Sequence, residues 1–190
     1  MRLITAEAGA PRDGERLSGD AILVRRDGKR SLLALIDALG HGPEAHAVAS
    51  RACDILRTAS LDHGLPPLLD AVAQGLAGGR GAAGMFCLLD GEHLHGCGVG
   101  NVQLRTTAGV PVVLSEGVLG GRIRKLRFFE GALRSRGRLV LWSDGLATRV
   151  ASDALTDATP AVAVERLMRD YRYHHDDASV LVADWEPSLP

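Results

Sequence analysis

Apolar residues fall into short runs along most of the chain, which is the pattern of β-strands joined by tight turns. Near the N-terminus the runs predict strands over 2–8, 18–26 and 31–37. The Asp27-Gly28 pair between the last two runs is typical of a hairpin turn, because glycine tolerates positive φ. Residues 32–36 are all apolar, so we expect both faces of that strand to be covered.

The pattern changes to helical spacing after the glycine-rich break at 40–42. Apolar residues recur at three- and four-residue intervals over 43–59, and Pro43 suits the first turn of a helix. Two more helices are expected over 66–76 and 160–170.

The remaining runs predict a meander of short strands and one last strand. These strands are expected over 85–89, 93–97, 102–105, 112–115, 126–129, 138–142 and 178–183. Strands, then helices, then many strands, then a helix and a strand indicate an α+β fold with antiparallel sheets.

Composition narrows the class of protein. The 190 residues are 46% apolar, which predicts a single globular domain over 1–190. A net charge of −1, with basic residues gathered only locally at 122–127, gives no expectation of nucleic-acid binding. Three cysteines form neither a disulfide framework nor a zinc site, and no apolar run reaches membrane-spanning length. We therefore expect a cytoplasmic protein without a membrane partner.

Four aspartates lie at predicted strand ends or edges: Asp20, Asp37, Asp144 and Asp176. Three of them stand beside glycine or another aspartate, and Asp37 precedes the glycine-rich loop 40–42. Carboxylates that converge from several strand ends repel one another unless cations neutralise them. Oxygen ligands without cysteine or a set of histidines select magnesium or manganese rather than zinc. A single Asp-Gly is usually only a turn, and Asp27 and Asp90 are such cases.

The ordered set of motifs around these aspartates resembles the type 2C, or PPM, family of metal-dependent protein serine/threonine phosphatases. The matching segments are 18–20 (Ser-Gly-Asp), 37–42 (Asp-Ala-Leu-Gly-His-Gly), 141–145 (Leu-Trp-Ser-Asp-Gly) and 176–180 (Asp-Asp-Ala-Ser-Val), with a glycine-rich turn at 98–102. The 37–42 motif is similar to that of the sporulation and stress-regulator branch. The short chain resembles the stand-alone stressosome phosphatases of that branch.

The resemblance implies a β-sandwich of two antiparallel sheets flanked by helix pairs. It implies that Asp37 bridges two divalent cations, Mn²⁺ or Mg²⁺, and that the backbone carbonyl of Ala38 binds one of them. Asp20, Asp144 and Asp176 complete the two coordination shells. The family usually has glycine in place of Ala38, but a carbonyl ligand does not require a particular side chain. A hydroxide bridging the cations then attacks the phosphate ester of a phosphoserine or phosphothreonine.

Two roles remain open for His41, on the loop after Asp37. It is either the general acid that protonates the leaving alkoxide, or a residue that caps the next helix or orients a carboxylate.

The resemblance also implies a phosphorylated protein substrate, specifically STAS-domain proteins of a stressosome, acted on by a monomer. The glycine-rich, basic stretch 116–125 is expected to face that substrate. Two alternatives are a non-catalytic binding module of the same fold and a two-metal phosphatase acting on a small molecule. The lack of a basic surface argues against a nuclease.

Overall fold

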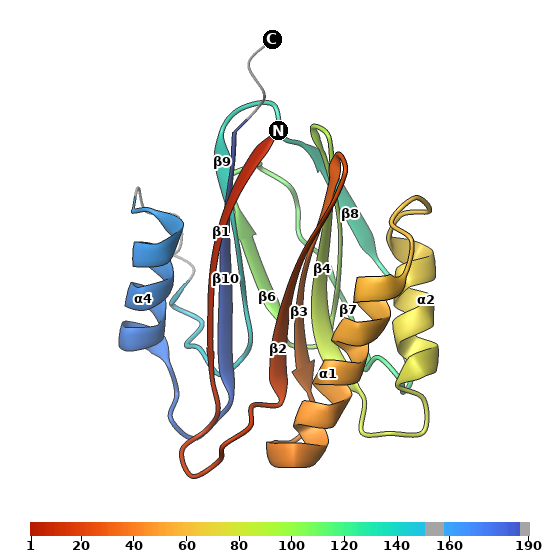
Figure 1. Ribbon diagram of the computed structural model, residues 1–190, viewed down its shortest axis with the longest axis vertical. Coiled ribbons are helices and arrows are strands. Elements are labelled where there is room, and N and C mark those ends of the chain that lie inside the picture. Colours follow the sequence, from red (N-terminus) through yellow and green to blue (C-terminus); the bar gives the residue numbers. More distant parts are fainter. Residues whose placement is uncertain (151–157, 187–190) are drawn as a thin grey trace.

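Two β-sheets pack face to face, and helices cover their outer faces (Figure 1). The computed structural model describes residues 1–150 and 158–186. Sheet A has four strands in the order β1 (Arg2–Ala10), β10 (Ala178–Glu186), β9 (Gly137–Trp142), β6 (Gln103–Thr106). Sheet B has six strands, in the order β2 (Asp20–Asp27), β3 (Arg30–Ala38), β4 (Ala82–Asp90), β5 (His93–Val99), β7 (Leu114–Ser115), with β8 (Phe128–Ala132) also paired to β5. The predicted α+β sandwich is confirmed.

The central strand β3 divides the apolar residues between two cores. Leu33 and Leu35 point between the sheets, where they join the core that contains residues of β9 and β10. Leu32 and Ile36 point outward into the core beneath the helices. All four are fully buried, as expected from the continuously apolar run 32–36.

Helices α1 (Gly42–Thr58) and α2 (Leu65–Gly75) cover the outer face of sheet B, and α4 (Pro160–Tyr171) covers sheet A. The expected helix pair is therefore present on sheet B, whereas on sheet A the described residues contribute α4. All three helices have proline at the first or second position, as predicted for α1. None of the described helices has the length and apolar content needed to cross a membrane.

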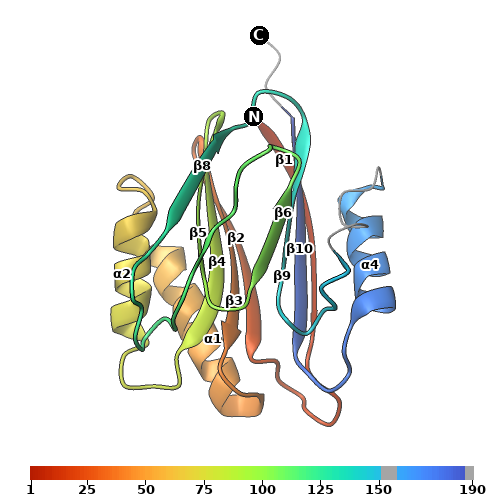
Figure 2. The ribbon, with the colours of Figure 1, turned by 180° about the vertical axis from the view of Figure 1, so that it is seen from behind.

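The predicted meander is wrong in its connections. After the β4–β5 hairpin the chain crosses to sheet A for β6, returns to sheet B for β7 and β8, and crosses again for β9 (Figure 2). β7 is shorter than predicted and pairs parallel to β5. Hydrophobic alternation reveals which face of a strand is buried, but it does not reveal the sheet to which the strand belongs.

This topology brings four loops to one end of the sandwich, the lower end in Figure 1. They are the loops before β2, after β3, after β9 and before β10. Each predicted aspartate ligand lies at one of these strand ends.

Candidate metal centre

Asp20 and Asp37 face each other across a pair of neighbouring strands. The Gly28 turn sets the β2–β3 register, in which Asp20 is the direct partner of Asp37. Side chains of directly opposed residues lie on the same face of a sheet. The predicted pair therefore shares one edge of the site.

Sheet A contributes Asp144 and Asp176 to the site. Asp144 follows β9 and Asp176 precedes β10, and these strands are antiparallel neighbours with Trp142 opposite Val180. The carboxyl group of Asp144 interacts electrostatically with that of Asp37 and accepts a hydrogen bond from the amide of Asn101. The structure thus brings all four predicted aspartates to the same end of the sandwich.

Burial and mutual repulsion raise pKa values within this cluster of carboxyl groups. Burial raises the pKa of Asp37 to about 8, assisted by the charges of Asp20, Asp144 and Asp176. Burial likewise raises the pKa of Asp144, with Asp176 contributing. Within the described part of the chain, no lysine or arginine forms an ion pair with any of the four. The cluster therefore lacks the positive charge that its ionised form requires.

Asp20 is held by two buried serines. Its Oδ2 accepts hydrogen bonds from Ser143 Oγ at 2.6 Å and from Ser179 Oγ at 2.8 Å. These bonds favour the ionised form, but burial prevails and raises the pKa of Asp20 to about 7. Both serines lie in motifs read from the sequence, but their role as a clamp on Asp20 was not predicted.

Asp177 differs sharply from its neighbour Asp176. The two oxygens of Asp177 accept backbone hydrogen bonds from Arg12 at 2.8 Å and Gly19 at 2.7 Å, and its side chain is buried. Asp177 therefore ties the loop before β2 to the start of β10. The backbone of Gly145 packs so closely against Asp177 that a side chain at Gly145 would overlap its carbonyl. Glycine after Asp144 thus makes room for the backbone of Asp177.

This contrast predicts opposite effects of two adjacent substitutions. Asp177→Asn should lower the free energy of unfolding by about 1–3 kcal/mol, because an amide nitrogen replaces one acceptor and leaves a buried N–H unpaired. Asp176→Asn keeps the acceptor for the Asp177 N–H and should leave stability in EDTA unchanged while weakening cation binding. Urea unfolding and calorimetric Mn²⁺ titration of both variants measure these effects. Equal losses of stability would contradict the assignment.

The donor chemistry fits hard divalent cations. The candidate ligands are carboxylate oxygens without sulfur, which is the set that Mg²⁺ and Mn²⁺ prefer. As the side chains stand, no three His, Cys, Asp or Glu residues among those described are close enough to hold an ion. Two of the carboxyl groups instead bond to Asn101, Ser143 and Ser179. Cation binding would require these side chains to turn toward a common point, so the ligand set, including the carbonyl of Ala38, stays a prediction.

His41 lies at the N-cap of α1, and its side chain makes no capping hydrogen bond. Its Nδ1 lies 2.9 Å from Oε1 of Glu15, which belongs to the loop before β2. The ring is therefore oriented by a carboxylate rather than engaged in capping. Glu15 was missed, because nothing in its local sequence distinguishes it from other loop residues.

Arg80 was also missed. It lies just before β4, and its guanidinium packs against Gly40, where a side chain would lie 2.5 Å from Nη1. It is also paired with Glu44 in the first turn of α1. Arg80 brings a positive charge to the loop that follows Asp37, and no sequence pattern signalled it.

Comparison with known proteins supports the fold. No protein-family model matches the chain, and no curated protein matches its sequence. One similar structure comes from work on the bacterial stressosome as a modular system adapted to control secondary messenger signalling. Its sequence is 28% identical to this one, and the two structures superpose with a TM-score of 0.88 over 96% of this chain and all of that one. RsbX in complex with magnesium is 19% identical, with a TM-score of 0.83 over 96% of this chain and 94% of that one. The Mycobacterium tuberculosis serine/threonine phosphatase PstP is 18% identical, with a TM-score of 0.75 over 97% of this chain and 99% of that one. The chain has the fold of these three structures, one of which is a serine/threonine phosphatase.

Proposed function

We propose that the chain is a metal-dependent phosphatase of the PPM family that hydrolyses phosphoserine and phosphothreonine esters in proteins. The observation that carries the proposal is the set of four mutually repelling aspartates at one end of this fold, with which no cationic side chain of residues 1–150 or 158–186 forms an ion pair. The fold likeness to the serine/threonine phosphatase PstP supports the same conclusion.

Asp37, Asp20, Asp144, Asp176 and the Ala38 carbonyl would hold two divalent cations. When bound, these cations supply a nucleophilic water and neutralise the charge of the phosphoryl oxygens. The protein contributes the positions of its ligands. Ser143 and Ser179 hold one oxygen of Asp20, and Asp177 holds the loop before β2, so the backbone that carries these ligands is fixed before substrate arrives.

We assign to His41 the role of general acid for the leaving serine alkoxide. Its side chain is 47% exposed at the loop after Asp37, and Glu15 on Nδ1 leaves Nε2 available to a substrate. A carboxylate partner of this kind orients an imidazole ring. The role agrees with the absence of a capping hydrogen bond.

The leaving group tests this role. His41→Ala should slow hydrolysis of a phosphoserine peptide by about 100-fold, within the usual contribution of general acid catalysis. An aryl phosphate should lose far less, because a phenolate leaves without a proton. Glu15→Gln should show the same selectivity in weaker form. Equal losses on both substrates would assign His41 to loop structure.

The proposed substrates are phosphorylated STAS-domain proteins of a stressosome. Support comes from the likeness to a structure solved in work on the bacterial stressosome and to RsbX. The stretch 116–125 lies beside the aspartates, because Leu119 bridges Ala82 at the start of β4 and Ala82 is paired with Ala38. A cavity of about 300 Å³ next to this stretch is lined by Glu116, Arg124, Lys125 and Arg127. We expect this basic rim to contact the folded substrate.

A comparison of two substrates tests the partner assignment. The value of kcat/KM should be at least about 10-fold higher for an intact phosphorylated STAS protein than for its isolated phosphopeptide, because a docking surface adds binding energy. Exchanging Arg122, Arg124 and Lys125 for glutamine should remove most of that preference. The same exchange at the exposed, distant Arg26, Lys29 and Arg57 changes the net charge equally and should preserve it. Equal rates on protein and peptide would leave only the general phosphatase proposal. If neither substrate releases phosphate in the presence of divalent cations, the result would favour a non-catalytic binding module.

A further inference from the structure

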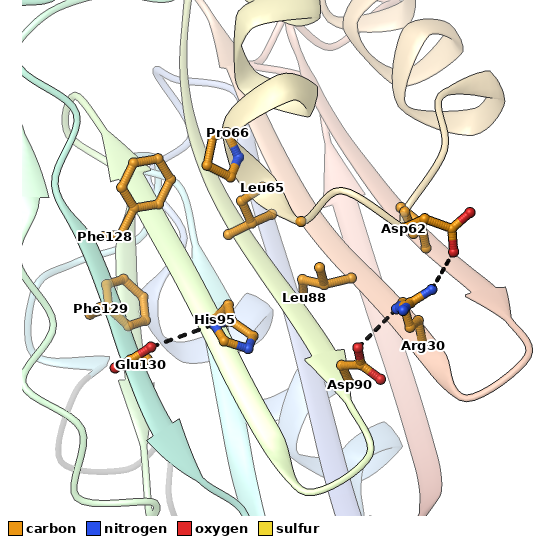
Figure 3. Close-up of a pocket in the computed structure, with 12 residues that line it drawn as sticks. Arg30, Asp62, Leu65, Pro66, Leu88, Asp90, His95, Phe128, Phe129 and Glu130 are labelled. Carbon is orange, nitrogen blue, oxygen red and sulfur yellow. Dashed lines mark hydrogen bonds and ion pairs between the residues drawn. The ribbon is translucent and has the colours of Figure 1, made fainter.

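Figure 3 shows a cavity of about 430 Å³ that is lined by Arg30 and Asp90. These two paired residues lie at the end of the β3–β4 pair away from Asp37. Arg30 begins β3 and Asp37 is its last residue but one, roughly 23 Å away at the usual strand rise. The first turn of α2, with Leu65 and Pro66, forms one wall of the cavity, and Leu88 of β4 lies on its floor. Nothing in the proposed catalytic chemistry uses this cavity.

The strand β8 forms the other wall and is an open edge. β4 occupies one side of β5, so β7 and β8 share the other side. Among the described residues, no backbone hydrogen bond joins β8 to any segment except β5. Figure 2 shows β8 at the border of sheet B. Such an edge presents unpaired N–H and C=O groups that can pair with another extended chain.

The outward side chains of β8 combine an apolar group with a negative charge. Phe128 is 46% exposed, which is unusual for a large aromatic side chain, and it borders the cavity. Two residues along, Glu130 is 81% exposed and lies 3.8 Å from His95. Successive outward residues of a strand are two positions apart, so both face the same side as the cavity.

The cavity rim carries an excess of negative charge. Arg30 is the rim's one guanidinium, and it is already shared between Asp62 at 2.5 Å and Asp90 at 2.9 Å. Glu130 adds a third carboxylate, with His95 as its neighbour. An occupant with an apolar group and a positive charge would complement this surface.

We propose that β8 and this cavity form a docking site for an extended segment of a partner protein. The segment adds as a new strand along β8, places an aliphatic or aromatic side chain beside Phe128 and Leu65, and places a lysine or arginine two residues away opposite Glu130. Backbone pairing gives such strand addition its affinity, and the side chains at alternate positions give its specificity. The site is separate from the aspartates, so its test does not depend on catalysis.

The test begins with display of random octapeptides on phage, selected on the wild-type protein and counter-selected on a Phe128→Asp variant. Enriched sequences should carry an apolar residue two positions from lysine or arginine. An enriched peptide is then synthesised with a fluorescent label and measured by fluorescence polarisation. Phe128→Ala and Glu130→Lys should each weaken binding by at least about 10-fold, the loss typical of a central contact. Exchanging the peptide's basic residue for glutamate should restore binding to Glu130→Lys.

Two further measurements identify the mode of binding. Two versions of the peptide are made, with methyl groups on the odd-numbered or on the even-numbered backbone nitrogens. One version should lose binding and the other should keep it, because only alternate N–H groups pair with the edge strand. Both β8 variants should hydrolyse an aryl phosphate at the wild-type rate, since Phe128 and Glu130 lie far from the aspartates. Circular dichroism confirms that the variants are folded.

The proposal fails if no sequence pattern is enriched, or if enriched peptides bind the Phe128→Asp variant as tightly as wild type. It also fails if the protein sediments as a dimer that Glu130→Lys dissociates, because the edge would then belong to a second copy of the chain. Tolerance of every methylation pattern would likewise exclude strand addition.

Discussion

Replacing Asp37 with asparagine is expected to lower kcat/KM on a phosphoserine peptide by about 1000-fold or more, since each tenfold loss corresponds to 1.4 kcal/mol of transition-state stabilisation. Asp37 interacts electrostatically with all three other aspartates of the cluster, so it is the position from which both cations can be held. An amide has nearly the same shape but carries no charge. The substitution should therefore remove cation binding while the fold remains intact.

The same variant should be no less stable than the wild type in EDTA at alkaline pH. Burial and three neighbouring carboxylates oppose the charge of Asp37, so a neutral side chain relieves repulsion. Loss of turnover with equal or higher thermal stability distinguishes a functional carboxylate from a structural one. This combination is measured by peptide hydrolysis, calorimetric Mn²⁺ titration and thermal melting of one preparation.

Asp27→Asn is the matched control. Asp27 lies at the other end of the same hairpin, is 56% exposed and pairs with Arg25 at the surface. Exposed ion pairs contribute little, so activity and cation binding should stay near wild-type values. Full activity in Asp37→Asn, or an equal loss in Asp27→Asn, would remove the basis of the proposed function.

The sequence predicted those parts of the structure that depend on local patterns. The apolar run at 32–36 identified the strand buried on both faces, and the Asp27-Gly28 turn set a register that places Asp20 opposite Asp37. The three helices were predicted correctly because their apolar spacing and initial prolines are local signals. Element boundaries differed by a few residues, as for β8, which extends to Ala132.

Features that depend on distant contacts could not be predicted. Asp176 and Asp177 are equivalent in a sequence motif, and only the backbone N–H groups of Arg12 and Gly19 assign Asp177 to structure. The serine clamp on Asp20 joins residues more than 120 positions apart in the chain. The exchange of strands between the two sheets is likewise set by tertiary packing, which has no periodic signature. The gathering of the four aspartates was predictable only because each follows or precedes a recognisable strand.

Thermal stability in EDTA is expected to fall as pH rises from about 6 to about 8.5, and divalent cations are expected to reverse this trend. In the folded protein the pKa values of Asp20 and Asp37 are raised to about 7 and about 8, from 3.8 for an ordinary aspartate. The folded state therefore binds more protons than the unfolded state between these values, and its stability decreases with pH. The favourable contribution is complete below pH 3.8 and is lost as pH rises through the folded pKa values.

The expected change is large enough to measure. One unit of pKa shift corresponds to 1.36 kcal/mol, and 1 kcal/mol moves the melting temperature of a domain of this size by about 2–4 °C. We expect the melting temperature in EDTA to fall by at least about 4 °C over this pH range. A cation at 100 times its Kd adds about 2.7 kcal/mol by binding only the folded state. Its effect should be greatest at alkaline pH, where the ligands have already lost their protons.

Asp37→Asn isolates the contribution of the cluster from that of the seven histidines, which both proteins share. The variant lacks the carboxyl group with the higher of the two pKa values, so its melting temperature should depend less on pH in EDTA and should hardly respond to Mn²⁺ or Mg²⁺. Differential scanning calorimetry of wild type and variant at four pH values, with and without each cation, measures both effects together. Identical pH profiles for the two proteins would show that Asp37 does not contribute to the pH dependence of stability. A wild-type protein indifferent to both cations at alkaline pH would show that the aspartates do not form a metal centre.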